Sequence, residues 1–284
     1  MIVGRLLSDI AERLRGLSDT PELDAQVLLA HILNKPRTRL LAHLETRLTD
    51  AQIDSTEKAL LQLTMGTPLP YVLGRWEFFG REFIVTPDVL IPRPETELLV
   101  EHAIAWLQQH PARRRAIDIG TGSGCIAVSL AVEVRDLRVL ATDLSLPALK
   151  VARQNARKHR VVKRMDLVRC DLLPSHTNPL PTESQFDLIC ANLPYIPTKT
   201  LHGLPIYGRE PTLALDGGRD GLTLVRHLLK LAPRWLAPGG MILLEIEAGE
   251  GLKTLSLVYD HFDRARISLH RDLSGKDRLI KIEL

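Results

Sequence analysis

A glycine-rich segment in the middle of the chain follows directly on a short apolar run. Residues 115–119 lead into Gly120-Thr121-Gly122-Ser123-Gly124, and a second apolar stretch follows. Glycines at alternate positions let the backbone turn sharply and let a ligand approach closer than a Cβ atom would allow. Asp143 lies 23 residues after Gly120, at the end of the next apolar run, where a carboxylate can accept hydrogen bonds from both hydroxyls of a ribose. This spacing predicts a nucleoside pocket.

Asp118 distinguishes between two kinds of nucleotide cofactor. The loop has the pattern Gly-x-Gly-x-Gly, whereas NAD sites have Gly-x-Gly-x-x-Gly. Asp118 would repel a pyrophosphate but attract the cationic sulfonium and amino groups of S-adenosylmethionine. We therefore predict S-adenosylmethionine as the cofactor and S-adenosylhomocysteine as its product. The predicted cofactor residues are Asp118, Gly120, Thr121, Gly122, Gly124, Asp143, Leu144, Asp171, Leu172 and Asn192. Among them, Asp171 is expected to reach the adenine amino group, and Leu172 to pack on the ring.

A second polar turn, Asn192-Leu193-Pro194-Tyr195, follows the apolar run 186–191. Carboxyl ends of parallel strands meet at one edge of a sheet, so we expect this turn beside the glycine loop. The side-chain oxygen of Asn192 and the carbonyl of Pro194 can accept hydrogen bonds from a planar amide or an exocyclic amine. Tyr195 can pack on such a group. We predict Asn192, Pro194 and Tyr195 as catalytic residues that act by aiming a nitrogen at the methyl group.

Three charged residues elsewhere are further candidates for substrate contacts. Arg93 and Glu95 come just before a predicted helix, where they can position a substrate or cap the helix. Glu210 belongs to the long segment 197–218, which we expect to close over the substrate, although a surface carboxylate is an equally simple interpretation. Together with the turn from Asn192 to Tyr195, Leu193 included, these residues form the predicted substrate site.

The elements that must position these residues alternate between helix and strand. Helices are predicted at 95–109, 124–134 and 146–158, and strands at 115–119, 138–142, 165–170, 186–191 and 241–246. This alternation predicts an α/β fold with a mostly parallel sheet covered on both faces, the Rossmann-like class I methyltransferase arrangement.

The residues that precede this domain have a different pattern. Apolar residues recur at helical spacing from Leu6 to Leu63, which predicts a small all-α N-terminal domain. The segment 68–94 alternates glycine and proline with short β-branched or aromatic runs, which predicts a β-hairpin linker. The predicted domains are 1–72, the helical domain; 73–92, the linker; and 93–284, the methyltransferase domain.

Composition excludes several classes of protein. The net charge is only +3, from 37 basic and 34 acidic residues, so we expect no stable binding to nucleic acid; the basic stretch 153–164 is interpreted as a solvated face. The three cysteines form no CxxC pair, and the histidines have no metal-ligand spacing, so no metal is predicted. No apolar stretch approaches the roughly 20 residues of a membrane span, so we expect no membrane contact. The unpaired cysteines fit a cytoplasmic protein, and the lack of a surplus apolar helix face favours a monomer.

Several further segments resemble one enzyme family, the peptide chain release factor N5-glutamine methyltransferases (PrmC/HemK). The resemblance extends over nearly the full length. It rests on residues 68–74 with Phe79-Gly80, on Pro92-Arg93-Pro94-Glu95-Thr96-Glu97, on Glu210-Pro211 and on residues 214–218. It implies a helical domain that docks a release factor, and a catalytic domain that methylates the glutamine of the factor's Gly-Gly-Gln loop.

Leu193 departs from the pattern of that family, which usually has Asn-Pro-Pro-Tyr at this turn. Asn-Leu-Pro-Tyr also resembles the turn of rRNA adenine dimethyltransferases, so an rRNA or DNA adenine-N6 methyltransferase stays an alternative. Those enzymes lack the long segment that precedes the glycine loop here. Enzymes that methylate a glutamine of a ribosomal protein are a second alternative, and a scaffold that binds the cofactor without catalysis is a third.

Overall fold

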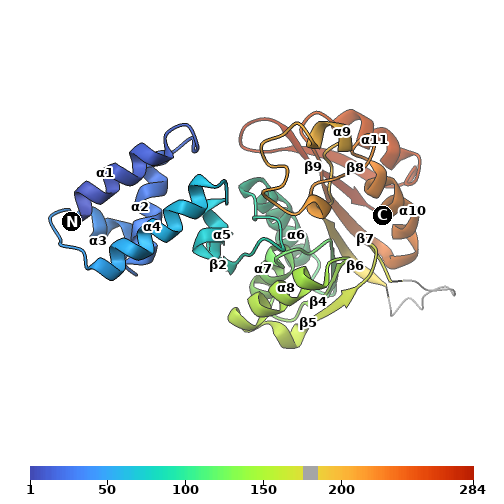
Figure 1. Ribbon diagram of the computed structural model, residues 1–284. Coiled ribbons are helices and arrows are strands. Elements are labelled where there is room, and N and C mark those ends of the chain that lie inside the picture. The colour runs from blue at the N-terminus through green and yellow to red at the C-terminus, as the bar shows by residue number, and fades with distance from the viewer. Residues whose placement is uncertain (175–184) are drawn as a thin grey trace. The chain divides into compact units, whose positions relative to one another are not determined.

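The computed structural model describes residues 1–174 and 185–284, which form two compact units, Met1–Arg75 and Trp76–Leu284. The first unit is entirely helical among its regular elements (Figure 1). Its helices are α1 (Val3–Leu14), α2 (Pro21–Ile32), α3 (Arg37–Leu41), α4 (Asp50–Thr64) and α5 (Leu69–Leu73). The sequence prediction of a helical N-terminal region is confirmed.

The core of the first unit follows the predicted helical spacing only in part. Leu6 and Ile10 of α1 are fully buried, and Leu14 nearly so. Leu17 and Leu61, which belong to the same apolar pattern, are more than half exposed and lie outside the core. Leu17 lies beyond the end of α1, where the helical period no longer applies. At the start of α4, Thr49 and Gln52 form a reciprocal capping box.

The second unit is built on a seven-stranded sheet with the order β5-β4-β3-β6-β7-β9-β8. Strands β3 to β7 pair in parallel, and β9 pairs antiparallel with both β7 and β8. The strands are β3 (Arg115–Ile119), β4 (Arg138–Asp143), β5 (Met165–Arg169), β6 (Phe186–Ala191), β7 (Leu236–Glu245), β8 (Arg266–Arg271) and β9 (Asp277–Glu283). The predicted mostly parallel α/β sheet is confirmed.

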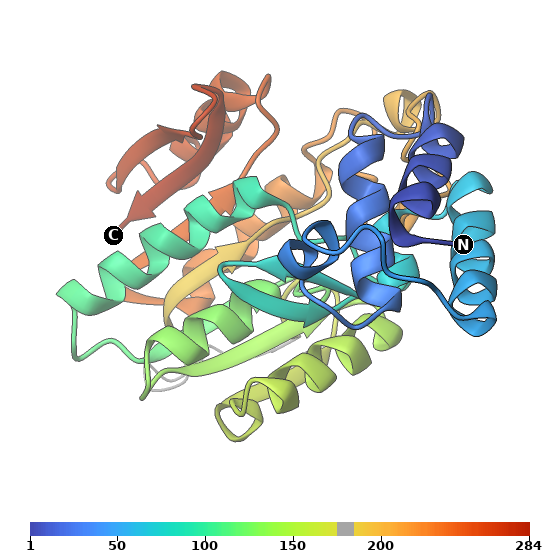
Figure 2. The same ribbon diagram turned by 90° about the vertical axis from the view of Figure 1, so that its left-hand side faces the viewer.

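Alternate residues of the inner strands belong to two separate cores, one on each face of the sheet. Ala116 and Cys190 pack with α6 (Glu97–Gln109), α7 (Cys125–Glu133) and α8 (Leu146–Lys158). Ile117 and Ile189 pack on the opposite face with α10 (Thr223–Trp235) and α11 (Gly251–Tyr259). Figure 2 shows α6, α7 and α8 lying along one face. A sheet buried on both faces explains why its strands are almost continuously apolar.

The remaining elements are short, and some were not predicted from the sequence. They are β1 (Arg75–Phe78), β2 (Arg81–Ile84), α9 (Thr198–Leu201) and the 3-10 helices η1 (Pro94–Thr96), η2 (Val162–Arg164) and η4 (Thr212–Ala214). The antiparallel pair β8–β9 was also missed, because its outer strand is only half-buried and mixes polar with apolar residues. Within the described ranges, no helix is long and apolar enough to cross a bilayer.

Asn155 of α8 links the hairpin to the glycine loop. Its Nδ2 donates to the carbonyls of Ile84 and Ser123, each at 2.9 Å, and its Oδ1 accepts from the N–H of Ile84 at 2.7 Å. Asn155 is fully buried. The hairpin also contributes Phe78 and Phe83 to the core on the α6 face. A single amide therefore satisfies three backbone groups that would otherwise be buried without partners.

We expect Asn155→Ala to destabilise the second unit by about 3 kcal/mol, because the lost side chain leaves buried backbone groups unsatisfied. Gln154→Ala is the matched control, since Gln154 is the exposed neighbour on the same helix. All three tryptophans, Trp76, Trp106 and Trp235, belong to this unit, so urea unfolding followed by tryptophan fluorescence reports on it alone. Equal midpoints for the two variants would contradict this role of Asn155.

Candidate functional site

The glycine loop leaves β3 and turns back toward β4 before α7 begins. Gly120, Gly122 and Gly124 all have positive φ angles, between 53° and 80°, which other residues rarely adopt. The N–H groups of Gly120 and Thr121 both donate to the carbonyl of Thr142, each at 2.9 Å. At Gly124 a Cβ atom would lie 3.1 Å from the Cβ of Ala152, so this glycine lets the loop pack against α8. The backbone conformation thus accounts for all three glycines.

Asp143, at the end of β4, accepts a hydrogen bond from the glycine loop. One carboxylate oxygen accepts from Gly122 N at 2.9 Å, and the other from Ser145 N at 2.8 Å. Each oxygen keeps a second lone pair for a further hydrogen bond. Burial raises the pKa of Asp143, although the N–H groups of Ser145 and Gly122 act in the opposite direction. The predicted nucleoside ligand and the loop can therefore share this carboxylate.

Asp118 lies beneath the glycine loop and is only 1% exposed. Its Oδ2 accepts from the Thr121 hydroxyl at 2.6 Å and from Ala127 N at 3.2 Å, so it holds the loop to the first turn of α7. Burial raises the pKa of Asp118 to about 7, against the lowering effect of those two hydrogen bonds. Its Oδ1 has no hydrogen-bond partner among the described residues. The direct cofactor contact predicted for Asp118 stays a prediction, and the structure gives this residue a role in loop geometry.

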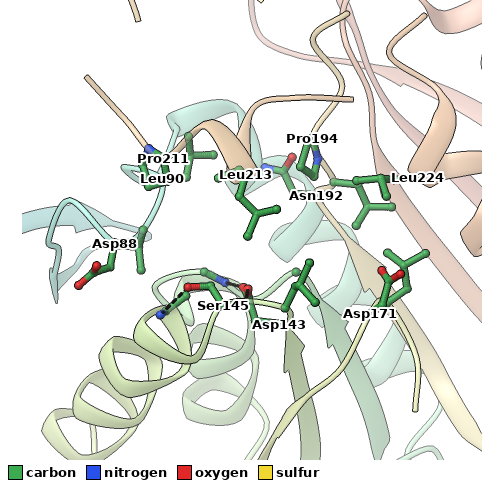
Figure 3. A pocket seen from close by; sticks show the side chains of 18 of the residues that line it. Asp88, Leu90, Asp143, Ser145, Asp171, Asn192, Pro194, Pro211, Leu213 and Leu224 are labelled. Atoms are coloured by element: carbon green, nitrogen blue, oxygen red, sulfur yellow. Dashed lines mark hydrogen bonds between the residues drawn. The ribbon is translucent and has the colours of Figure 1, made fainter. Parts of the chain in front are cut away.

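A pocket of about 880 Å³, part of it open to solvent, lies over the carboxyl ends of β3, β4 and β6. In Figure 3, Asp143 and Ser145 lie on one side of this cofactor pocket, and Asn192, Pro194 and Leu213 on the other. Among the predicted cofactor residues, those that line it are Gly120, Gly122, Asp143, Leu144, Asp171, Leu172 and Asn192. Thr121, Gly124 and Asp118 lie outside the lining.

Leu172 has an unusual backbone conformation at the wall of the cofactor pocket. Its φ is +55°, which is uncommon for a residue other than glycine, and its carbonyl accepts from the Thr142 hydroxyl at 2.7 Å. Such conformations are retained where the surroundings fix them, often at ligand sites. The hydrogen bond to Thr142 therefore fixes the segment that carries Asp171 and Leu172.

The turn at Asn192 lies beside the glycine loop, as predicted. β3 pairs with β6 through Ile119 and Ala191, the last residues of the two strands. The buried Leu193 packs against the loop, because its Cδ2 lies 3.5 Å from the position of a Cβ at Gly120. Leu193 therefore connects the two turns by apolar packing.

A second pocket, of about 400 Å³, adjoins the first at this turn. We call it the acceptor pocket. Asn192, Leu193 and Pro194 line both cavities, whereas Tyr195 and Arg93 line only the acceptor pocket. Burial raises the pKa of Tyr195 to about 12, so its hydroxyl stays protonated at neutral pH. A group in the acceptor pocket and a group in the cofactor pocket can therefore meet at the Asn192 turn.

Two glycines of the following segment shape the acceptor turn. At Gly217 a Cβ atom would lie 2.8 Å from the Pro194 carbonyl oxygen, and at Gly221 it would lie 2.3 Å from that of Tyr195. Ile196 N donates to the Leu215 carbonyl at 3.1 Å, and Gly217 N donates to the Ile196 carbonyl at 2.8 Å. The segment 197–218 therefore begins and ends beside the turn, and its closure over the substrate stays a prediction.

Glu210 joins two walls of the site. Its buried carboxylate accepts from Ile91 N at 3.0 Å and forms an ion pair with Arg93. Neither pocket is lined by Glu210 or by Glu95, which is exposed. The substrate contacts predicted for these two residues stay predictions. The structure gives Glu210 the role of fixing Arg93 at the edge of the acceptor pocket.

Sequence reasoning missed two walls of the cofactor pocket. One is Asp88–Leu90, after the hairpin, and the other includes Pro211, Leu213 and Ala214. Neither segment has a spacing that relates it to the glycine loop. The signal available in the sequence was that the family-like segments follow Asp88–Leu90 at 92–97 and include Pro211 and Ala214.

Comparisons with known proteins agree with this architecture. Residues 5–74 match the family described as PrmC N-terminal domain, and residues 94–202 match the methyltransferase small domain. In solved structures, the fold is similar to a 16S rRNA N2 G1207 methyltransferase of T. Thermophilus in complex with AdoMet and guanosine. That comparison gives a TM-score of 0.52 at 18% identity, over 74% of this chain and 49% of the other.

Curated relatives match over nearly the whole length. A release factor glutamine methyltransferase of Moorella thermoacetica is 41% identical over 98% of this chain and 97% of its own. The enzyme of the same name from Nitratidesulfovibrio vulgaris is 38% identical over 97% of this chain and 92% of its own. At this identity and coverage, the chain belongs to the release factor glutamine methyltransferase family.

Proposed function

We propose that this protein transfers a methyl group from S-adenosylmethionine to the side-chain amide nitrogen of a glutamine in a peptide chain release factor. The glutamine is that of the Gly-Gly-Gln loop. The observation that carries this proposal is the pair of adjoining pockets, which share Asn192 and Pro194. Two hydrogen-bond acceptors at the junction suit a nitrogen that carries N–H groups.

The residues of the cofactor pocket fit an adenosyl group with a positively charged sulfonium. Gly120 and Gly122 line the pocket without side chains, and Asp143 keeps lone pairs for ribose hydroxyls. Leu144 and Leu172 offer apolar surface for a purine, and Asp171 offers an acceptor for its amino group. Bound there, S-adenosylmethionine supplies an electrophilic methyl group.

The acceptor turn contributes by orientation. The Asn192 side-chain oxygen and the Pro194 carbonyl would accept the two N–H groups of the glutamine amide, so that the nitrogen faces the methyl group. Holding two reacting groups at close range supplies much of a rate enhancement. The nitrogen forms a bond to the methyl carbon as the sulfur–carbon bond breaks, and the resulting cationic amide loses a proton to solvent. Tyr195, protonated and partly buried, packs beside the amide.

An adenine acceptor is the second candidate, because Asn-Leu-Pro-Tyr resembles the turn of adenine methyltransferases. The packing of Leu193 weakens this argument. Since its side chain is buried against the glycine loop, the choice of leucine is explained by packing inside the protein. The two candidates are distinguished by supplying the enzyme with labelled S-adenosylmethionine and either a release factor or rRNA.

We expect label in the release factor and none when its loop glutamine is replaced by alanine. Equal labelling of both factors, or labelling of rRNA alone, would refute the proposal. Mass spectrometry of the loop peptide would locate the added methyl group on the glutamine.

Asp143→Asn should weaken S-adenosylmethionine binding by about tenfold to a hundredfold, which corresponds to roughly 1.4 to 2.8 kcal/mol. The reason is that the variant loses one of the oxygens that hold Gly122 and Ser145, together with the charge that favours ribose hydroxyls. Isothermal titration calorimetry measures the Kd. Asp166→Asn, a change at an exposed residue of β5, is the control and should bind like the wild type.

Asn192→Ala should lower kcat by about a hundredfold or more while leaving the Kd for S-adenosylmethionine within about twofold. Asn192 lies at the junction of the two pockets, so its loss removes the orientation of the acceptor rather than the cofactor site. Single-turnover transfer to a release factor gives the rate. A parallel loss of cofactor binding would show that Asn192 acts mainly in the cofactor pocket.

A further inference from the structure

A buried carboxylate, Glu245, lies next to the acceptor turn. β6 and β7 pair in parallel through Ala191 and Leu244, so Asn192 and Glu245 are the next residues on adjacent strands. Glu245 is 2% exposed, and its Oε2 has no hydrogen-bond partner in the described part of the chain. Burying an ionisable group without full pairing is unfavourable, so its presence at this place calls for an explanation.

Thr96 completes a buried polar cluster with Asn192 and Glu245. The Nδ2 of Asn192 donates to the Thr96 hydroxyl oxygen at 3.0 Å, and Thr96 is also 2% exposed. Burial raises the pKa of Glu245 to about 7, while hydrogen bonds from the side chains of Thr96 and Asn192 act in the opposite direction. All three side chains therefore interact with one another at the end of the sheet.

The chemistry of these groups selects one orientation of the Asn192 amide. The oxygen and nitrogen of an asparagine side chain have almost the same shape, so only the surroundings decide which one points where. An ionised carboxylate accepts hydrogen bonds and donates none. Glu245 and Thr96 therefore hold the NH₂ group, and the oxygen remains for the pockets that Asn192 lines.

The orientation matters because the flipped Asn192 amide would point its NH₂ group, a hydrogen-bond donor, at the glutamine amide that receives the methyl group. A glutamine amide nitrogen also carries only donors, so two N–H groups would face each other. We propose that Glu245, together with Thr96, is a positioning residue that fixes the Asn192 amide with its oxygen toward the acceptor pocket. This inference rests on the proposed function, since it assigns a cause to the orientation that the transfer requires.

Glu245→Gln is the direct test. Glutamine has the same shape but can donate as well as accept, so it no longer distinguishes the two ends of the Asn192 amide. We expect kcat for release factor methylation to fall about tenfold, with the Kd for S-adenosylmethionine within about twofold of the wild type. Thr96→Val should act in the same direction, and the control Asp166→Asn should leave kcat unchanged.

A double-mutant cycle separates positioning from a structural effect. If Glu245 acts through Asn192, adding Glu245→Gln to Asn192→Ala should not lower the single-turnover rate further. The inference is wrong if Glu245→Gln lowers the rate of the Asn192→Ala variant by the same factor by which it lowers the rate of the wild type. It is also wrong if Glu245→Gln weakens cofactor binding as strongly as it lowers kcat.

An independent measurement does not depend on activity. In protein labelled with ¹⁵N-asparagine, the Asn192 side-chain NH₂ signals are assigned by their loss in Asn192→Ala. We expect them to shift with pH near 7 as Glu245 titrates, and not to do so in Glu245→Gln. The charged groups that act on Glu245 are Arg278 of β9, which favours its ionised form, and Glu95, which opposes it.

The same titration gives the sign of the pH effect on activity. The ionised carboxylate selects the productive orientation, so kcat should fall as pH decreases through about 7, and this decrease should be absent in Glu245→Gln. NH₂ signals that do not respond to Glu245 would overturn the inference. If the wild type labels no release factor while these signals do respond, the proposed function fails and the positioning role stands.

Discussion

The parallel pairing of β3 with β6 is the constraint on which the site depends. It brings the last residues of both strands, Ile119 and Ala191, side by side, so that the glycine loop and the acceptor turn must emerge at the same edge. The contact between Leu193 and the loop then fixes the two turns at van der Waals distance. The two turns are therefore brought together by backbone pairing rather than by a flexible connection.

Three carboxylates lie at or near this edge, and each is held differently. Asp143 accepts backbone N–H groups, Asp118 accepts from Thr121 and Ala127, and Glu245 interacts with Thr96 and Asn192. Burial raises the pKa of all three. Ionisable groups whose pKa is shifted by burial and by specific partners are typical of functional sites. The sheet provides the rigidity that keeps those partners in place.

Segments far apart in the sequence form the walls of the cofactor pocket and the acceptor pocket around this edge. The Glu210 carboxylate ties the segment after the hairpin to the segment after α9 through Ile91 and Arg93. Gly217 and Gly221 let the second of these segments approach the carbonyls of Pro194 and Tyr195. Close backbone packing at these glycines therefore holds together the segments that line the acceptor pocket.

The sequence alone was sufficient to predict the inner strands and the helices between them along the chain, the glycine loop, and the turn at Asn192 beside it. These features depend on local signals: apolar runs, glycines at positions that need positive φ, and polar residues at strand ends. It also indicated the family, through segments such as Pro92–Glu97. Periodicity does not show where a helix ends or which of its faces is covered, so Leu17 and Leu61 belong to the apolar pattern but are exposed.

Only the tertiary structure decided what the remaining residues contact. Glu245 comes 53 positions after Asn192, and Thr96 lies 96 positions before it, so no spacing rule connects them. Likewise, the sequence could not show that Asp118 bonds to Thr121 and Ala127 or that Glu210 pairs with Arg93. The physical reason is that hydrogen bonds and burial depend on which elements lie next to each other. Sheet pairing and packing between distant segments determine that arrangement.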